Sequence, residues 1–303
     1  MSTTPGGLTT PGVVKTTNEI LISLAPEITM VKQFTYDISN TVADYGTMVR
    51  IPFLTAGTVE EYDDSTKNYE HPTGSMSDLF VQLTSQPKVT IPLTSQDLLE
   101  LPNDSFWSKA KEASVNVISK ALSSAICGNF TKANIEPSST DRQVEMVGVD
   151  TSFVAQLRNK AAEKGRIADY VLVLDGAAYA DLLSVLPVNI YGNTDPIQNG
   201  VLQKIYGFKS IICSYDLPSG IRGVLVPADG LAVAIRPVAI PDPAAYPECG
   251  VVTDEQGFAL TAMRHTSFAT AKAFYNVTTL IGTKLIRPEA TFYIVDKEQN
   301  GEG

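Results

Sequence analysis

The residue whose position most suggests chemistry is Asp175, which ends the apolar run Val171–Leu174 and precedes Gly176. A carboxylate at the end of a buried strand can hold magnesium or act as a nucleophile. No second acidic residue follows at close spacing, and Asp-Gly is also an ordinary turn signal after a strand. We therefore expect Asp175 to be a turn residue, with an α/β phosphate-ester hydrolase using Asp175 as an alternative.

The other potentially reactive side chains do not indicate a catalytic or metal-binding site. Neither His71 nor His265 has a cysteine or an acidic partner at metal-ligand spacing, and one imidazole alone supports neither a zinc site nor a proton relay. Cys127, Cys213 and Cys249 are odd in number and far apart, as expected for buried thiols in a reducing compartment. The sequence lacks a Walker lysine, a nucleophile elbow and a dinucleotide fingerprint. We expect no catalytic residue, no metal and no cofactor.

A long two-stranded ribbon is predicted between residues 42 and 92. Its outgoing strand covers 42–54, and its return strand covers 80–84 and 87–92. Pro52 and Pro92 cannot donate to a central ladder, so these strands should lie at an edge. A ribbon of this kind is marginal alone in water, and nothing in its own domain is expected to cover it. Burial by neighbouring copies of the chain would stabilise it, which indicates assembly rather than catalysis.

The tip of this ribbon is polar and acidic, with too few apolar residues to belong to a core. Calcium binding is conceivable there, but no loop with regular oxygen-ligand spacing is visible. We expect the tip to make inter-subunit contacts. The candidate assembly residues are Glu60, Glu61, Tyr62, Asp63, Asp64, Lys67 and Tyr69.

Composition excludes several classes of protein. Hydrophobic residues make up 44% of 303 residues, enough for a sizeable core, whereas charged residues make up only 18%, which indicates a partly covered surface. The net charge is −10 and no basic cluster is present, which argues against tight nucleic-acid binding. No signal peptide and no apolar run long enough to span a bilayer are visible, so we expect a cytoplasmic product without a membrane partner.

The strongest predicted element is a helix over residues 97–130, which Pro102 divides. Asn103 or Asp104 can cap its second part, and Gly128 lies where a helix ends. Apolar residues at steps of three and four predict one face about six turns long. This predicted face consists of Phe106, Ala110, Ala113, Val117, Ala121, Leu122, Ala125 and Ile126.

A compact α/β block is predicted after this helix, with Asp150 capping a helix that ends at Gly165. Irregular linkers at 131–148 and 237–249 bracket the block and suggest a domain inserted into a discontinuous one. The block's predicted elements are strands at 169–174, 208–214, 223–227 and 231–235 and a helix at 177–183. A returning antiparallel sheet is predicted from strands at 258–263, 271–275, 280–285 and 291–295.

The order of these elements resembles that of the major capsid proteins of tailed bacteriophages with the Hong Kong 97-type fold. Several local segments are similar to a short-tailed phage branch of these coat proteins. These segments are Gly200–Phe208, Val226–Ala234, Arg236-Pro237, Val252–Gly257, and Tyr275-Asn276-Val277 with Gly282. The resemblance implies an α+β fold in five parts: an N-terminal arm (1–41), an extended two-stranded loop (42–96), a peripheral domain beginning with a spine helix (97–149), an inserted axial α/β domain (150–240) and a peripheral sheet (241–303).

The same resemblance implies a structural function. The chain would self-assemble into pentamers and hexamers that form an icosahedral shell around packaged double-stranded DNA, enclosed without sequence-specific binding. It would work with a separate scaffolding protein and a portal protein. Its location would be the virion capsid, assembled in the cytoplasm of a bacterial host. An encapsulin-like protein compartment shares the fold and is the nearest alternative.

Overall fold

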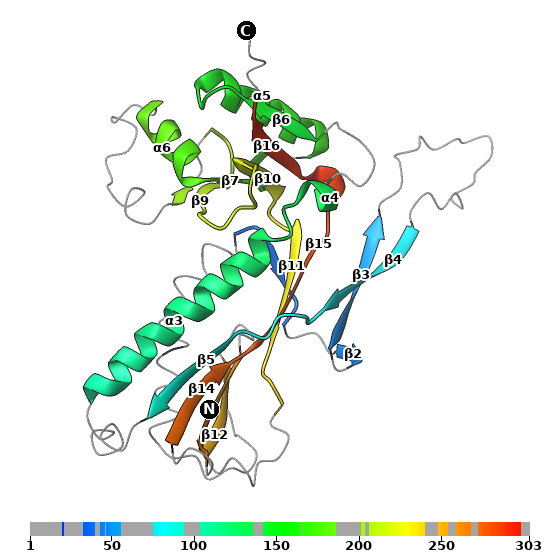
Figure 1. Ribbon diagram of the computed structural model, residues 1–303. Coiled ribbons are helices and arrows are strands. Elements are labelled where there is room, and N and C mark those ends of the chain that lie inside the picture. Colours follow the sequence, from blue (N-terminus) through cyan, green and yellow to red (C-terminus); the bar gives the residue numbers. More distant parts are fainter. Residues whose placement is uncertain are drawn as a thin grey trace, which may run out of the picture.

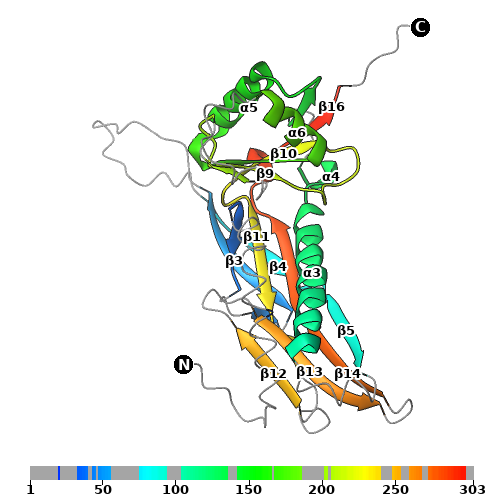
Figure 2. The ribbon, with the colours of Figure 1, turned by 90° about the vertical axis from the view of Figure 1, so that its left-hand side faces the viewer.

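The computed structural model is an elongated molecule with an α/β block at one end and a sheet at the other (Figures 1 and 2). A long helix, α3, runs between the two ends, and a two-stranded ribbon projects from the side. The structure describes residue 20 and the ranges 33–39, 43–45, 47–55, 75–93, 104–135, 142–165, 167–185, 201–203, 206–239, 248–253, 259–267 and 272–297. In this part of the chain, no helix is long and apolar enough to cross a membrane.

Helix α3 spans Asp104–Cys127, so the predicted start after Pro102 and the predicted stop at Gly128 are both confirmed. The end is capped twice: the Gly128 backbone N donates to the Ser124 carbonyl (2.9 Å), and the side-chain Nδ2 of Asn129 donates to the Ala125 carbonyl (2.9 Å). These bonds satisfy carbonyls that have no partner within the helix.

The predicted apolar face of this helix is partly wrong. Leu122 and Ile126 are buried as expected, but Ala113 is exposed and Val117 is 48% exposed. The fully buried position in the preceding turn is Ile118, which lies in the main core cluster with Leu122 and Ile126. Buried residues recur along the helix in steps of four. The prediction followed the regularly spaced alanines, which lie on an adjacent face of the helix.

The six-stranded sheet of the α/β block has the order β6-β16-β10-β7-β9-β8. Its two faces are both covered, which explains why all five residues of β7 are buried. Phe153, Leu157 and Leu182 of helices α5 and α6 pack on one face, and Ile126 and Phe130 from the end of α3 pack on the other. The strands are β6 (Gln143–Met146), β7 (Tyr170–Leu174), β8 (Val201–Gln203), β9 (Ser210–Cys213), β10 (Gly223–Pro227) and β16 (Phe292–Asp296), and the helices are α5 (Thr151–Lys164) and α6 (Gly176–Val185).

Two sequence expectations fail in this sheet. The strand expected at 291–295 to join the C-terminal sheet is β16, which pairs instead with β10 and β6. The segment 131–148, expected to be irregular, contains β6 and the short helix α4 (Lys132–Ile135). Asp150 does cap α5 as predicted, because its carboxylate accepts from Phe153 N at 2.7 Å, and Gly165 follows the last helical residue.

The four-stranded sheet at the other end has the order β12-β13-β14-β5 and is antiparallel throughout. Its edge strand β5 corrects the predicted ribbon, because 87–92 was expected to return along the outgoing strand but pairs with β14 instead. Pro92 does lie on an edge strand, as predicted. The strands are β5 (Lys88–Leu93), β12 (Glu248–Thr253), β13 (Ala259–Ser267) and β14 (Lys272–Thr278).

A three-stranded sheet, β1-β11-β15, occupies the middle of the molecule. It corrects two predictions, because the strand at 231–235 was expected in the α/β block and the strand at 280–285 in the C-terminal sheet, whereas the two pair with each other. The ribbon proper is β3 with β4, which pair antiparallel from Met48↔Gln82 to Thr55↔Ser75. The short strand β2 pairs with β3 at Val49 and Met48, so among the described strands Pro52 has a neighbour on one side only, as predicted. The bounds are β1 (Thr35–Asp37), β2 (Ala43–Tyr45), β3 (Met48–Thr55), β4 (Ser75–Gln82), β11 (Leu231–Arg236) and β15 (Leu280–Leu285), with 3-10 turns at Ile167–Asp169 and Pro288–Ala290.

The base of the ribbon is not isolated, contrary to the expectation that nothing in its own domain covers it. Val49 and Val81 are fully buried and pack, in one cluster, with Ala232 and Ala234 of β11. Beyond β4, Ser85 and Ile281 exchange backbone hydrogen bonds of 3.1 and 2.8 Å, which joins the chain after the ribbon to β15. The ribbon therefore leaves the molecule from an anchored base.

Candidate assembly surface

The ribbon presents a second face that the described part of the chain leaves largely exposed. Since side chains alternate along a strand, Arg50 and Pro52 point away from the buried Val49 and Ile51. Arg50 lies opposite Phe80 in the ladder, and the Phe80 side chain is 40% exposed. An exposed aromatic ring on an anchored strand is the kind of side chain that interfaces favour.

Charged groups lie along this outer ribbon face, which we define as Met48, Arg50, Pro52, Asp78, Phe80 and Gln82. The Arg50 guanidinium lies 2.8 Å from the Asp78 carboxylate, with both side chains more than a third exposed. Such an ion pair contributes at most about 1 kcal/mol in water. The Lys284 ammonium donates to the Phe80 carbonyl at 3.1 Å, which adds a link from the ribbon to β15.

Sequence reasoning did not single out Phe80, although the alternation of Val81 and Leu83 with Phe80 and Gln82 carries the signal. The predicted assembly residues at the tip, Glu60, Glu61, Tyr62, Asp63, Asp64, Lys67 and Tyr69, lie outside the described residues, and so does His71. Their assembly function stays a prediction.

Asp175 has structural partners that account for its position. Its Oδ1 accepts from Ala178 N at 2.7 Å and so caps the start of α6, while its Oδ2 lies 2.5 Å from Arg222 Nη1. Arg222 also lies 3.1 Å from the carboxylate of Asp296, at the end of β16. The carboxylate therefore joins three segments of the block at the turn where the sequence predicted a turn residue.

His265 and the cysteines contribute to packing. The His265 ring stacks on Phe274 with centroids 5.4 Å apart. The three thiols are free; Cys127 is buried, and Cys213 and Cys249 are half-buried. Burial raises the pKa of the Cys127 thiol and that of Cys213, so both are protonated and poorly nucleophilic at neutral pH. Across the described residues, no group of three His, Cys, Asp or Glu side chains is placed to hold a metal ion.

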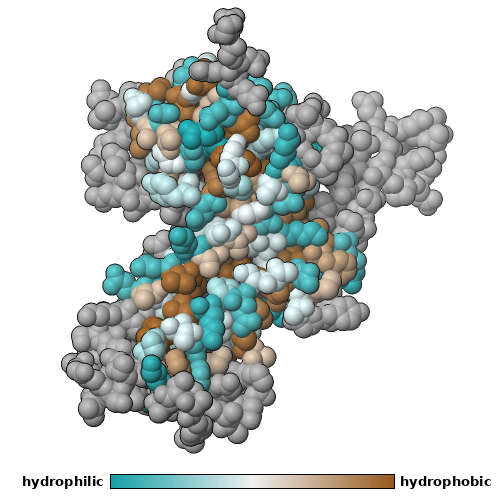
Figure 3. All heavy atoms as spheres, in the orientation of Figure 1, coloured by the Kyte–Doolittle hydropathy of each residue, from teal (hydrophilic) through white to brown (hydrophobic). Residues whose placement is uncertain are grey.

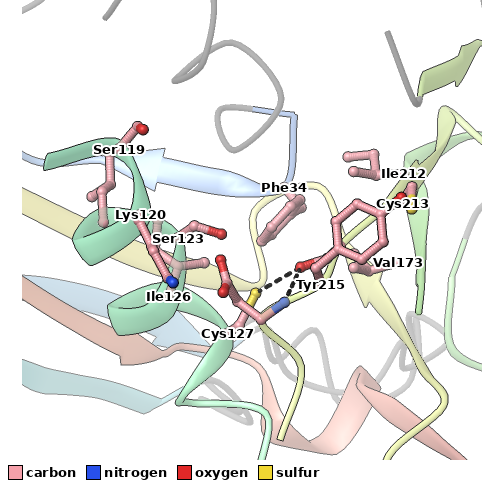
Figure 4. A pocket seen from close by; sticks show the side chains of 13 residues that line it. Phe34, Ser119, Lys120, Ser123, Ile126, Cys127, Val173, Ile212, Cys213 and Tyr215 are labelled. Carbon is pink, nitrogen blue, oxygen red and sulfur yellow. Dashed lines mark hydrogen bonds between the residues drawn. The ribbon is translucent and has the colours of Figure 1, made fainter. Parts of the chain in front are cut away.

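A cavity of about 450 Å³ lies where α3 meets the six-stranded sheet. Figure 4 shows Lys120 and Ser123 of α3 on one side and Ile212 and Tyr215 of the block on the other. At its floor the Cys127 thiol lies 3.4 Å from the Ser214 hydroxyl. A buried, protonated thiol beside a hydroxyl forms no activated nucleophile. We therefore interpret this cavity as a packing gap between two parts of the chain.

The space-filling view shows apolar and polar residues interspersed on one face of the described molecule (Figure 3). Large exposed apolar side chains occur singly on separate elements, with Tyr36 on β1, Val117 on α3 and Tyr215 on the loop after β9. Single exposed apolar residues are normal on protein surfaces. The outer ribbon face differs from them because it projects from the body of the molecule (Figure 1).

No protein-family model and no curated protein sequence matches this chain. Solved structures do. The chain is similar to a subunit in the capsid of the cyanophage P-SCSP1u, with a TM-score of 0.55 and 10% identity over 88% of each chain. It is similar to the virus-like particle protein of Pyrococcus furiosus, with a TM-score of 0.54 and 13% identity over 95% of this chain and 100% of that one.

A third similar structure is the capsid of the empty GTA particle, with a TM-score of 0.52 and 12% identity over 98% of this chain and 94% of that chain. These identities are too low to carry function, but each match covers almost the whole of both chains. The chain therefore has the mixed α and β fold found in phage capsid subunits.

Proposed function

We propose that this chain is the major capsid protein of a tailed bacteriophage, with the Hong Kong 97-type fold and a relationship to the short-tailed branch. Copies assemble into pentamers and hexamers that close an icosahedral shell around double-stranded DNA. The subunit has an N-terminal arm, an extended loop, a spine helix, an axial α/β domain and a peripheral sheet, with β6 and β16 assigned to the axial α/β domain because they pair within its six-stranded sheet. A separate scaffolding protein and a portal protein act in assembly, which takes place in the host cytoplasm.

The observation that carries this proposal is the ribbon. Its inner face is buried on β11 through Val49 and Val81, while its outer face exposes Phe80 beside the pair formed by Arg50 and Asp78. An apolar centre with a charged rim is the usual composition of a protein interface. A neighbouring copy that covers this face supplies the burial that a two-stranded ribbon lacks alone. The whole-length similarity to phage capsid structures supports the same proposal.

A protein compartment of the encapsulin type is the second candidate. The similarity to the virus-like particle of Pyrococcus furiosus fits either candidate, because that match covers 100% of the other chain with a TM-score nearly equal to that of the cyanophage capsid. The two candidates share a subunit fold and differ in what the shell contains.

The hydrolase alternative has less support. A nucleophilic or magnesium-binding aspartate needs an accessible carboxylate. Both oxygens of Asp175 are engaged, one by Ala178 N and the other by Arg222. The ion pair and the helix cap explain this residue without catalysis.

The test is expression of the whole chain in bacteria, followed by light scattering and electron microscopy of the purified protein. We expect closed icosahedral particles, or irregular shells that become regular when a scaffolding protein is supplied. A monodisperse monomer at every concentration contradicts any shell function. Particles that package one specific protein and no DNA favour the compartment over the phage capsid.

A further inference from the structure

Four side chains with metal-binding atoms share one face of the four-stranded sheet. Cys249 of β12 lies directly opposite Met263 of β13, and Met263 lies directly opposite Asn276 of β14. His265 is two residues along β13 from Met263 and therefore points to the same face. This row of a thiol, a thioether and an amide, with an imidazole beside it, crosses three adjacent strands.

The spacing of an antiparallel sheet brings these atoms within reach of one another. Directly opposite residues have Cβ atoms about 4.5–5.5 Å apart, which lets the sulfur atoms of Cys249 and Met263 converge on a common point. His265 leans toward the same row, since its Nδ1 lies 3.1 Å from the amide nitrogen of Asn276. Stacking on Phe274 holds the imidazole plane in that orientation.

The side chain of Asn276 has hydrogen-bonding capacity that its described neighbours do not satisfy. The residue is only 2% exposed, and its buried Oδ1 has no hydrogen-bond partner among the residues that the structure describes. A buried amide oxygen in that state is unfavourable, because it has given up its hydrogen bonds to water. Its amide nitrogen can only donate, so Nδ1 of His265 accepts that bond and carries a lone pair on the side of the row.

We propose that Cys249, Met263 and His265 form a binding site for one soft monovalent cation, Cu(I), with the amide of Asn276 beside it. Thiolate and thioether sulfur select Cu(I), and imidazole also suits copper. The thiol releases its proton to solvent when the metal binds. The ion takes the place of the Asn276 amide at Nδ1 of His265.

The consequence is mechanical. Among the described strands, β12 is an edge strand that pairs with β13 alone. A cation bound through Cys249 of β12 and Met263 and His265 of β13 fastens this edge by bonds that do not depend on the backbone ladder. Cys249, Met263 and His265 are all half-buried, so the site is open enough for a transfer of the ion from solution.

The experiment is titration of the full-length chain with Cu(I) under anaerobic conditions, in competition with a chromophoric Cu(I) chelator. We expect one tightly bound ion per chain. Met263→Leu conserves volume and removes the thioether, and Cys249→Ser removes the thiol; each should weaken Cu(I) binding at least about tenfold. Met146→Leu and Cys213→Ser are matched controls on the six-stranded sheet and should leave the affinity unchanged.

Two results overturn the proposal. One is a Cu(I) affinity that Met263→Leu and Cys249→Ser leave unaltered while circular dichroism shows all variants folded. The other is tighter binding of Zn(II) than of Cu(I), since a thioether ligand does not favour zinc. X-ray absorption at the copper edge supplies an independent readout, with sulfur and nitrogen neighbours expected in the wild type and fewer sulfur neighbours in Met263→Leu.

Discussion

Gly282 sets how closely the ribbon's base approaches β15, and its replacement gives the sharpest stability prediction. A Cβ built on Gly282 lies 2.7 Å from the Gln82 carbonyl oxygen, 3.1 Å from the Gln82 carbonyl carbon and 3.0 Å from Leu83 Cδ2. Two of these three atoms belong to backbone, which cannot turn aside as a flexible side chain can. Gly282→Ala therefore pushes β4 away from β15.

The expected cost follows from overpacking, which destabilises a well-packed site by about 1–3 kcal/mol. We expect a loss of about 2 kcal/mol in the free energy of unfolding. With an m-value of about 3 kcal/mol/M, the urea midpoint of the unassembled subunit falls by roughly 0.7 M. Two backbone hydrogen bonds between Ser85 and Ile281 lie next to this contact. Weakening them would lower the free energy of unfolding further.

Gly148→Ala is the matched control. A Cβ at Gly148 meets no atom of the described residues within 4 Å, so the free energy of unfolding should change by no more than about 0.5 kcal/mol. Circular dichroism in urea measures both variants, and particle yield measures the effect on assembly. If Gly282→Ala is as stable as Gly148→Ala, the ribbon does not cross β15 at the distance described. The conclusion that the base of the ribbon is anchored on the central sheet would then be wrong.

Three further perturbations test other parts of the account. Asp175→Asn keeps an acceptor for Ala178 N but removes the charge that pairs with Arg222, so the free energy of unfolding in urea should fall by about 1–2 kcal/mol while particles form normally. If the wild-type chain has phosphatase activity and this variant loses it, the hydrolase is supported instead. Burial raises the pKa of Cys127 and lowers its thiolate fraction at pH 8, so mass spectrometry should find it unalkylated by iodoacetamide in the native chain and modified in urea; rapid native modification would contradict its burial. Phe80→Ser should leave circular dichroism unchanged and reduce particle yield, whereas Val147→Ser, at an exposed site on the α/β block, should leave the yield unchanged; equal yields for the two variants would remove Phe80 from the interface.

Local signals in the sequence predicted element ends better than partners. Gly128 and Asp150 were predicted correctly because a helix stop and an N-cap depend on the residues beside them. The partners of β5 and β16 were not, because both strands pair with segments far along the chain, and an apolar run does not record which sheet it joins. The predicted apolar face of α3 lies beside the buried face rather than on it. Alanine is small enough to lie on the buried or the exposed side of a helix, so its spacing does not identify the buried side.

The surface that we propose for assembly was predictable only in outline. A ribbon near residues 42–92 follows from alternation and from Pro52, but its buried inner face on Ala232 and Ala234 depends on the arrangement of the central sheet. Phe80 faces outward because Val81 faces inward, and Val81 faces inward because it packs against β11. The sequence of the ribbon alone does not contain that contact. Asp175 was interpretable as a turn residue from sequence, whereas its ion pair with Arg222 required the fold.

The most direct test of the central claim is a cryo-electron microscopy reconstruction of the particles formed by the full chain. The account predicts that the outer ribbon face, with Arg50, Pro52 and Phe80, is buried against a neighbouring copy, while Val49 and Val81 keep their contacts with β11 of their own subunit. A shell in which the outer ribbon face remains in solvent, or a chain that forms no shell under any condition of assembly, would contradict it.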